Sequence, residues 1–312
     1  AYVGGLAGSV SMIGDIVLLN SAYEGDVRVN YGGSGKVYVT GLGISYGSTS
    51  EYFTGCSVRG SIWAEAAAGN IEAIGICQMS GGNSDVEIYA KSESGLATAI
   101  GALHCVNMDF TGSITAETVS GTAEAMGVNG MISGSNSGAV RAISTGSGNA
   151  KAYGAGTGVF GGYLHHFTNY ADVTATGGDE AYAIGIRAGT GSRDVLNKGT
   201  VNARADRAAN AFGISFVRLV DGKGIQEATN DANVSAAAEY ANAHGLAGCT
   251  FSANNGNISA NSEEGKAKAV ALSGCDSSEN RGMVFSTGVA YGADEGYGLN
   301  NDSHDCVNYG TI

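Results

Sequence analysis

The sequence predicts an all-β fold, a single parallel β-solenoid of about eleven coils. A short unit recurs from end to end at separations of about 24 to about 35 residues, the range of solenoid repeats. The chain of 312 residues contains 52 glycines and no proline, and parallel ladders use every backbone N–H. Its apolar residues, 43% of the chain, are mostly alanine, valine and isoleucine with one tryptophan, which suits closely stacked backbones.

Each unit is centred on one apolar residue, which we call the anchor. Side chains two residues apart share a strand face, so the anchor and the residue two positions later predict a short strand with a small inward face. That later residue is alanine in seven units, as in Ala203 after Val201. The predicted anchors are Val27, Ile62, Val86, Ile114, Val140, Val173, Val201, Val234, Ile258, Val284 and Ile312.

Two positions before the anchor, eight units carry glycine and the other three carry Ser84, Ala171 or Ala232. A glycine at this place suggests a corner where φ is positive or two backbones approach closely. We therefore expect the chain to bend just before each anchor strand.

Four positions before the anchor, the last seven units carry asparagine. Asparagine tolerates the left-handed region, and asparagines on successive coils can stack into an amide ladder. The predicted ladder consists of Asn136, Asn169, Asn197, Asn230, Asn254, Asn280 and Asn308. The first four units have Tyr23, Val58, Gly82 and Phe110 at this place. The N-terminal third is therefore expected to pack differently.

A second strand is predicted at an A-x-G-I step, as in residues 183–186. Two or three short strands per coil, each paired with the coils above and below, describe a parallel solenoid. Coils of more than about 20 residues favour the right-handed form, and a rise of about 4.8 Å per coil predicts a rod of roughly 50 Å. No linker or composition break divides residues 1–312, so we expect one continuous domain, with loops projecting near 45–55, 158–167 and 216–230.

The charge and composition exclude several classes of protein. The formal net charge of −13 repels a phosphate backbone and an anionic membrane surface, so we expect no nucleic-acid partner. No apolar run approaches the roughly 20 residues of a membrane-spanning helix. An acidic balance of this kind is typical of secreted or surface proteins, which predicts an extracellular location.

Both ends of the chain resemble open solenoid faces. The opening AYVGGLAG aligns with AYAIGIRAG at 181–189, a second strand, and the chain finishes on the anchor Ile312. Either flanking residues complete these coils, or the ends stack head to tail. Because such a heterologous contact does not close, it would build a filament.

The six cysteines follow the repeat. Cys77, Cys105, Cys249 and Cys275 lie nine residues before a predicted anchor, and adjacent coils are close enough for a disulfide. We therefore predict Cys77–Cys105 and Cys249–Cys275 disulfides that clamp the two ends; the alternative is four buried free thiols. The remaining two cysteines, Cys56 and Cys306, lie six residues before an anchor. They are candidates for unpaired thiols or for an intermolecular disulfide.

The two ends resemble the GLUG-type repeats of bacterial surface proteins. The stretches that carry the resemblance are YVGGLAG at the start, NSAYEGDV at 20–27, GCSVRGSI at 55–62 and DCVNYGTI at the end. The resemblance implies an extracellular repeat protein, often a large adhesin, without catalytic residues. It also implies that Cys56 and Cys306 are buried core thiols. The middle of the chain departs from the family by lacking cysteine and by having A-x-G-I in place of G-G-L.

An enzyme is the alternative, because β-solenoids also host polysaccharide lyases and hydrolases. The best cluster is Tyr163, His165 and His166 in an expected loop, with Arg187 one coil later. Histidine or tyrosine could act as a base while arginine neutralises a uronate carboxylate. No paired carboxylates with the spacing of a glycosidase occur, since Asp179-Glu180 and Glu263-Glu264 are neighbours in predicted turns. Isolated His104 and His244 are expected to be structural.

We expect no cofactor. Calcium is a weak candidate at NDSHD (301–305) and TNDAN (229–233), which gather oxygen ligands but match neither an EF-hand nor a nonapeptide calcium repeat. An ice-binding face needs a regular outward row, and the outward residues are mixed in charge and size. They are Arg28, Trp63, Glu87, Thr115, Arg141, Thr174, Asn202, Ser235, Ser259 and Phe285. The favoured function is a structural or adhesive extracellular rod, with itself, a host receptor or a carbohydrate as partner.

Overall fold

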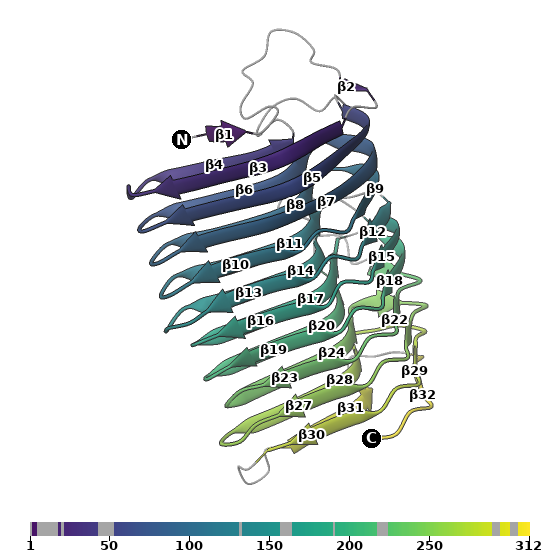
Figure 1. The fold of residues 1–312 in the computed structure, drawn as a ribbon. Helices are drawn as coiled ribbons and strands as arrows, with labels where there is room; N and C mark the ends of the chain where they lie inside the picture. Colours follow the sequence, from purple (N-terminus) through teal and green to yellow (C-terminus); the bar gives the residue numbers. More distant parts are fainter. Residues whose placement is uncertain are drawn as a thin grey trace.

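The computed structural model describes residues 2–4, 18–19, 22–42, 53–130, 133–156, 164–189, 191–216, 224–288, 294–299 and 305–312. In these residues every regular element is a β-strand, and all strand pairs are parallel. Figure 1 shows the strands stacked in layers from the purple N-terminal end to the yellow C-terminal end. The predicted fold class, an all-β parallel solenoid, is confirmed.

One side of the stack is an 11-stranded sheet, here called sheet A. Its strands carry the A-x-G-I step, and their order in the sheet follows their order in the chain. They are β1 (Tyr2–Gly4), β4 (Lys36–Leu42), β6 (Asn70–Cys77), β8 (Leu96–Leu103), β11 (Thr122–Asn129), β14 (Asn149–Gly156), β17 (Glu180–Ala188), β20 (Ala208–Phe216), β24 (Tyr240–Ala247), β28 (Lys266–Ser273) and β31 (Asp294–Leu299).

The remaining 21 strands form sheet B, which has two parts. The anchor face contains β3 (Ala22–Tyr31), β5 (Phe53–Ala66), β7 (Met79–Ser92), β10 (Ile114–Thr118), β13 (Val140–Ser144), β16 (Val173–Gly177), β19 (Val201–Ala205), β23 (Val234–Ala237), β27 (Ile258–Asn261) and β30 (Val284–Thr287). The narrow face contains β2 (Leu18–Leu19), β9 (Val106–Phe110), β12 (Gly134–Asn136), β15 (His165–Asn169), β18 (Arg193–Asn197), β21 (Ile225–Gln226), β22 (Thr229–Asn230), β25 (Cys249–Thr250), β26 (Ala253–Asn254), β29 (Glu279–Asn280) and β32 (Val307–Asn308).

The number of turns differs slightly from the expected eleven. The prediction counted one coil for each of the eleven anchors, whereas the stack forms about 8 turns.

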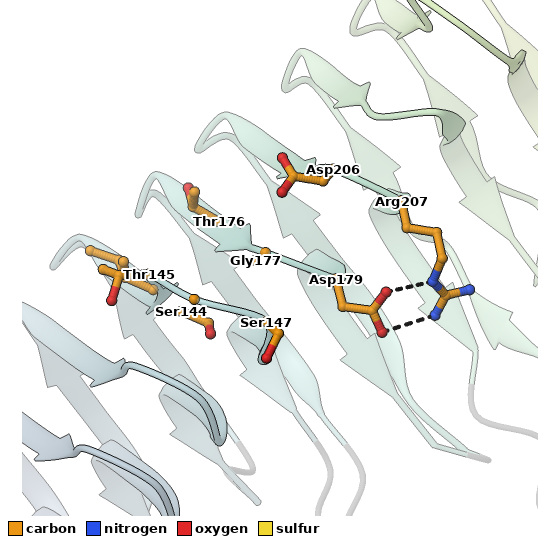
Figure 2. A pocket seen from close by; sticks show the side chains of 11 residues that line it. Ser144, Thr145, Ser147, Thr176, Gly177, Asp179, Asp206 and Arg207 are labelled. Atoms are coloured by element: carbon orange, nitrogen blue, oxygen red, sulfur yellow. Dashed lines mark hydrogen bonds and ion pairs between the residues drawn. The ribbon is translucent and has the colours of Figure 1, made fainter.

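Tight turns join the anchor strands to the strands of sheet A that follow them, and Figure 2 shows those near Thr145, Thr176 and Asp206. A hydroxyl at the end of the anchor strand closes several of these turns. The Ser92 Oγ accepts a hydrogen bond from the Gly95 N–H (2.9 Å) and donates one to the Gly69 carbonyl of the preceding coil (2.7 Å). Thr118 and Ser262 accept the equivalent bond at 3.0 and 2.7 Å. The turns are therefore tied both within and between coils.

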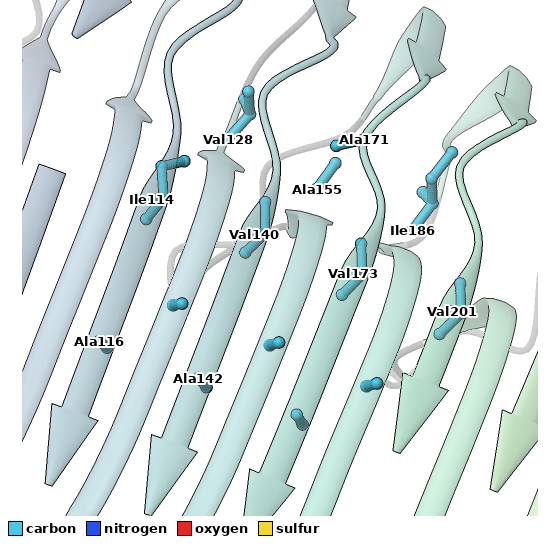
Figure 3. Packing of buried hydrophobic residues seen from close by; sticks show 14 of the residues in the cluster. Ile114, Ala116, Val128, Val140, Ala142, Ala155, Ala171, Val173, Ile186 and Val201 are labelled. Atoms are coloured by element: carbon cyan, nitrogen blue, oxygen red, sulfur yellow. The ribbon is translucent and has the colours of Figure 1, made fainter. Parts of the chain in front are cut away.

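The core is built from ladders of identical or similar small side chains (Figure 3). Val140, Val173 and Val201 lie directly opposite one another on successive coils and are fully buried. The alanines two residues later, Ala142 and Ala175, are also fully buried. Because these side chains are short, the anchor face and sheet A pack closely. The apolar surface buried between them stabilises every layer by about 25 cal/mol per Å².

The register corrects one predicted anchor. Ile88, rather than Val86, pairs with both Ile62 and Ile114, and Val86 pairs with Gly60. Val86 and Ile88 are both apolar and both buried on the same strand face, so a shift of two residues keeps the inward pattern intact. In this coil Ser84, not Gly82, therefore occupies the position of the asparagine ladder.

The expected corner before the anchor begins only at the fourth coil. β5 and β7 run straight through it as strands of 14 residues each. From β9 and β10 onward the chain breaks there, and a Cβ on Gly112 would lie 1.9 Å from the Val86 carbonyl oxygen. Close backbone approach, rather than positive φ, is thus what requires glycine at this position.

Buried asparagines run through the last seven coils. Asn136 donates from Nδ2 to the Asn169 Oδ1 (3.0 Å), and the same bond continues at every step to Asn308 at distances of 2.6–2.9 Å. From Asn169 onward, each Nδ2 also reaches the backbone carbonyl two residues later, as Asn230 does to Ala232 (3.0 Å). Each amide therefore bonds its own corner and the next coil.

A second apolar cluster lies on the outer side of sheet A, apart from the core. It contains Ile74, Ile100, Met126, Tyr153 and Ile184, with Tyr182 and Phe212 packed against it. Phe212 stacks on His244 at 4.8 Å between ring centroids, which places this histidine in the row. None of the described residues forms a helix that is long and apolar enough to cross a membrane.

Candidate functional surface

The narrow face carries a column of residues in the left-handed conformation. In seven of the described coils, the non-glycine residue seven positions before the anchor has φ near +50°, which lets the strand turn the corner. The non-glycine members are Asn107, His166, Asp194, Glu227, Phe251, Ser277 and Asp305. This conformation costs a non-glycine residue roughly 1–2 kcal/mol. The neighbouring coils must therefore impose it.

Charged side chains meet in the middle of this column. His166 Nδ1 lies 3.2 Å from Asp194 Oδ2. A hydrogen bond with Asp194, together with its negative charge, raises the pKa of Glu227. Two neighbouring carboxyl groups, one with a raised pKa, have the arrangement of an acid–base pair. Both groups, however, lie on the surface, and the side chain of Asp194 is 35% exposed.

His165 and Arg193 pair beside this column. The Arg193 Nε donates to the His165 Nδ1 at 3.2 Å. Burial, and then the positive charge of Arg193, lower the pKa of His165. The Nδ1 nitrogen that accepts this hydrogen bond carries no proton in this arrangement.

The predicted catalytic cluster is not assembled as expected. His165 and His166 belong to β15 rather than to a loop, and Tyr163 lies outside the described residues. Arg187 belongs to sheet A, where its guanidinium carbon lies 5.6 Å from the centre of the Tyr153 ring. Arg193, rather than Arg187, contacts His165. This contact depends on the register of β15 and β18, which the sequence alone does not give.

A shallow groove of about 920 Å³ crosses the turns between the anchor face and sheet A. Figure 2 shows Thr145, Ser147 and Thr176 along it, with Asp206 on the next turn. Arg207 closes one end by binding Asp179 through Nε (2.5 Å) and Nη2 (3.1 Å), and it also pairs with Glu180.

The pairing of Arg207 with Asp179 and Glu180 limits the chemistry that the groove can support. The hydrogen bonds from Arg207 lower the pKa of Asp179, so this carboxylate stays ionised. Asp179 and Glu180 are thus engaged by one guanidinium rather than poised as an acid and a base. Glu263 and Glu264 lie in an exposed turn, as expected. The groove offers hydroxyls and backbone groups for binding, without a proton-transfer pair.

The two predicted cysteine pairs differ in geometry. No disulfide joins any of the six cysteines in the structure. Cys77 lies opposite Leu103 and belongs to the outer cluster, whereas Cys105 belongs to the core, so the register that predicted their disulfide is wrong. The error follows from the misplaced anchor, because nine residues before Ile88 stands Met79.

Cys249 and Cys275 do lie on adjacent coils in matching positions, since Thr250 bridges to Asp276. Their side chains share a hydrogen bond, which together with burial raises the pKa of Cys249. Cys56 is a buried core thiol, and Cys306 is half-buried with its Sγ 3.5 Å from the Cys275 carbonyl. The Cys249–Cys275 disulfide stays a prediction.

The other predicted sites are engaged in stacking. In the 229–233 segment Asn230 points into the ladder, and Asp231 accepts a hydrogen bond from Asn255 (2.8 Å). Residues 301–304 lie outside the described part of the chain. Within the described residues, no three His, Cys, Asp or Glu side chains converge as metal ligands.

Sequence reasoning missed an aromatic pair on the anchor face. Trp63 and Tyr89 stack with ring centroids 4.1 Å apart, and the Tyr89 hydroxyl donates to Glu117 Oε2 at 2.8 Å. The shifted anchor had placed Glu87 beside Trp63 in the outward row. With Ile88 as the anchor, the alternation of the strand puts Tyr89 there.

No family model, no curated protein and no solved structure matches this chain. By fold it is a parallel β-solenoid, and because one fold hosts many functions, its role must be argued from its surface.

Proposed function

We propose that the chain is a structural, adhesive rod of an extracellular surface protein, of the kind that carries GLUG-type repeats. The observation that supports this role is the unbroken coil-to-coil pairing, in which the backbone and the buried asparagine amides bond each layer to the next. A rod of this design holds its shape without a large globular core. Its side chains vary at the turns and on the outer faces of the strands, where a binding surface can change without disturbing the stack.

Two assemblies satisfy this proposal. The rod is either one segment of a longer adhesin or a subunit of a head-to-tail filament. Electron microscopy of the purified protein separates them, because a filament gives strands with a subunit repeat near 40 Å, set by about 8 turns with a rise of about 4.8 Å each. Short separate rods at high protein concentration contradict the filament and leave the adhesin segment.

A carbohydrate-active enzyme is the second candidate, and the hydrogen-bonded Asp194–Glu227 pair favours it. The exposure of this pair weighs against it, because water-exposed charges are weakly perturbed and acid catalysis benefits from a dry site. We therefore rank the enzyme below the rod.

The proposal is tested by adhesion and turnover assays on the same preparation. Beads coated with the chain should be retained under flow on surfaces bearing host matrix proteins or glycans, and beads coated with heat-unfolded chain should not. Retention on no surface of the panel contradicts the adhesive role. Repeated release of reducing or unsaturated sugar ends, lost in Glu227→Gln, would establish the enzyme instead.

A further inference from the structure

A second groove, of about 420 Å³, lies on the narrow face near its C-terminal end. Two columns of outward residues line it. One is the left-handed column, with Glu227, Phe251, Ser277 and Asp305, and the other is Thr229, Ala253, Glu279 and Val307, which are aligned by strand pairing. Its strands β22, β29 and β32 lie along one side of the rod in Figure 1. We call it the Phe251 groove.

The groove has a rigid floor. Between the two columns, Ser252 and Ser278 point inward and are buried. Ser252 Oγ donates to the Thr250 carbonyl (2.9 Å) and accepts from the Ala228 N–H (3.0 Å). Ser278 Oγ makes the equivalent bonds to the Asp276 carbonyl (2.8 Å) and the Ser252 N–H (3.1 Å). The lining residues are therefore held at fixed spacing before any ligand arrives.

Phe251 is the unusual member of the groove. Its side chain is 65% exposed and its φ is +52°. A bulky side chain is a rare occupant of the left-handed region, where glycine or asparagine costs less. Leaving a phenylalanine in water at this strained place destabilises the free rod. A bound ligand that covers the ring would offset this cost.

The groups around the ring define the chemistry of that ligand. Glu279 pairs with Arg281 at 2.5 Å, whereas Glu227 and Asp305 add two further carboxyl groups to the lining, so the groove carries more acidic than basic groups. What remains is an apolar ring face bordered by acceptor oxygens and by the hydroxyls of Thr229 and Ser277. An aromatic platform with a few polar groups at its rim suits a ligand with one apolar face and a hydroxyl edge.

We propose that the Phe251 groove is a subsite for an uncharged pyranose unit of a glycan. The axial C–H face of the sugar packs on the Phe251 ring, and its hydroxyls donate to the carboxylates of Asp305 and Glu279. The surplus of carboxylates repels uronic and sialic acids, which sets the specificity. This subsite rests on the proposed adhesive role and names the receptor class for it.

The test is saturation-transfer NMR of the full chain with neutral, amino and uronic oligosaccharides. Neutral sugars should receive saturation from the aromatic protons on one ring face. Phe251→Asn should weaken their binding about tenfold or more, equivalent to about 1.4 kcal/mol. Because asparagine tolerates positive φ, this variant should be as stable as the parent, so a loss of binding is not a loss of fold.

Phe285→Ser is the matched control. Phe285 is 62% exposed on the anchor face and pairs with Ser259, so serine extends an existing row and should leave sugar binding unchanged. Equal binding by Phe251→Asn and the parent overturns the subsite, as does a preference for uronic acids. Salt-sensitive binding of basic peptides instead of sugars also overturns it.

The adhesion assay separates this subsite from the broader proposal. Beads carrying Phe251→Asn that are retained as well as parent beads overturn the subsite and leave the adhesive rod. Sugar contact by NMR with no retention of parent beads supports the subsite and contradicts the adhesive role.

Discussion

At the residue scale, the buried asparagine ladder is the most specific feature of the stack. Each interior amide is fully buried and bonded on both sides, as Asn197 is to Asn169 (2.8 Å) and Asn230 (2.9 Å). A buried amide left without its partner costs about 1–3 kcal/mol. The ladder therefore stabilises the correct stacking order more than it adds to net stability.

Replacing Asn197 tests this role. Asn197→Ala leaves the Asn169 donor and the Asn230 acceptor unpaired, so we expect a loss of about 2–4 kcal/mol in the free energy of unfolding. Urea unfolding followed by circular dichroism measures it. Asn202→Ala, on the outer face of the neighbouring strand, is the control and should change stability by less than about 0.5 kcal/mol. Equal losses in the two variants would contradict the ladder.

His244 makes the rod sensitive to acid. Burial, and secondarily the charge of Lys268, lower its pKa from the usual 6.5 to about 4. Between these values the unfolded chain binds more protons than the folded one, so stability falls as the pH drops from about 6.5 to about 4. The loss reaches at most about 3 kcal/mol at 1.36 kcal/mol per pKa unit.

His244→Phe should remove this pH dependence while keeping the stack on Phe212. Melting temperatures measured at steps between pH 7 and pH 4 test it. His166→Gln, an exposed histidine on the narrow face, is the control and should keep the parent slope. A parent-like slope in His244→Phe would show that another group causes the acid sensitivity.

At the element scale, the corner before each anchor strand is a steric requirement. A Cβ on Gly199 would lie 1.8 Å from the Ala171 carbonyl oxygen of the preceding coil, which accepts a hydrogen bond from Asn169 Nδ2 at 3.1 Å. Strand register there is set by this contact together with the inward pattern of the anchor.

Gly199→Ala should therefore cost about 3 kcal/mol or more, or prevent soluble folding, through a backbone clash. Gly32→Ala is the matched control, because a Cβ at Gly32 meets nothing within 4 Å. Urea midpoints of the two variants provide the measurement. A small effect at Gly199 would mean that the corners adjust freely.

The adjacent Cys249 and Cys275 should form a disulfide when the protein folds in an oxidising compartment, because matching residues on adjacent coils lie within bonding range. Non-reducing peptide mapping should show a Cys249–Cys275 peptide and no Cys77–Cys105 peptide. The link should vanish in Cys249→Ser. A map with every thiol free would exclude the clamp.

These elements also show what the sequence could and could not predict. The asparagine ladder was predictable because one residue type recurs at one place. The third anchor was not, because Val86 and Ile88 satisfy the same alternation. The charged column of His166, Asp194 and Glu227 was missed because its members share a backbone conformation rather than a residue type. Only the register brings such side chains together.

At the scale of the whole molecule, each coil contacts only its neighbours. Stability should then be a sum of similar steps rather than the property of one core. The repeat was strong enough to predict this architecture, but counting one coil per anchor overestimated the number of turns, eleven against about 8.

Deleting one coil tests this additivity. Removing residues 258–283 brings Val284 opposite Val234, in the place that Ile258 now occupies. We expect a folded rod whose melting temperature falls by less than about 10 °C. Removing residues 258–270, half of the same coil, breaks the alternation of faces and should unfold the C-terminal layers. Hydrogen exchange distinguishes the two; equal protection in both would contradict nearest-neighbour stacking.

The direction of the backbone hydrogen bonds has a mechanical consequence. They run parallel to the long axis, so a pull on the two ends loads the bonds of the outermost coil first. The coil from Ile62 to Ile88 spans 26 residues. Folded, it contributes a rise of about 4.8 Å to the length of the rod; unfolded and extended, it would contribute about 90 Å. Under tension such a rod yields one layer at a time. The unfolding of one coil therefore lengthens the chain and lowers the force, while the remaining layers stay folded.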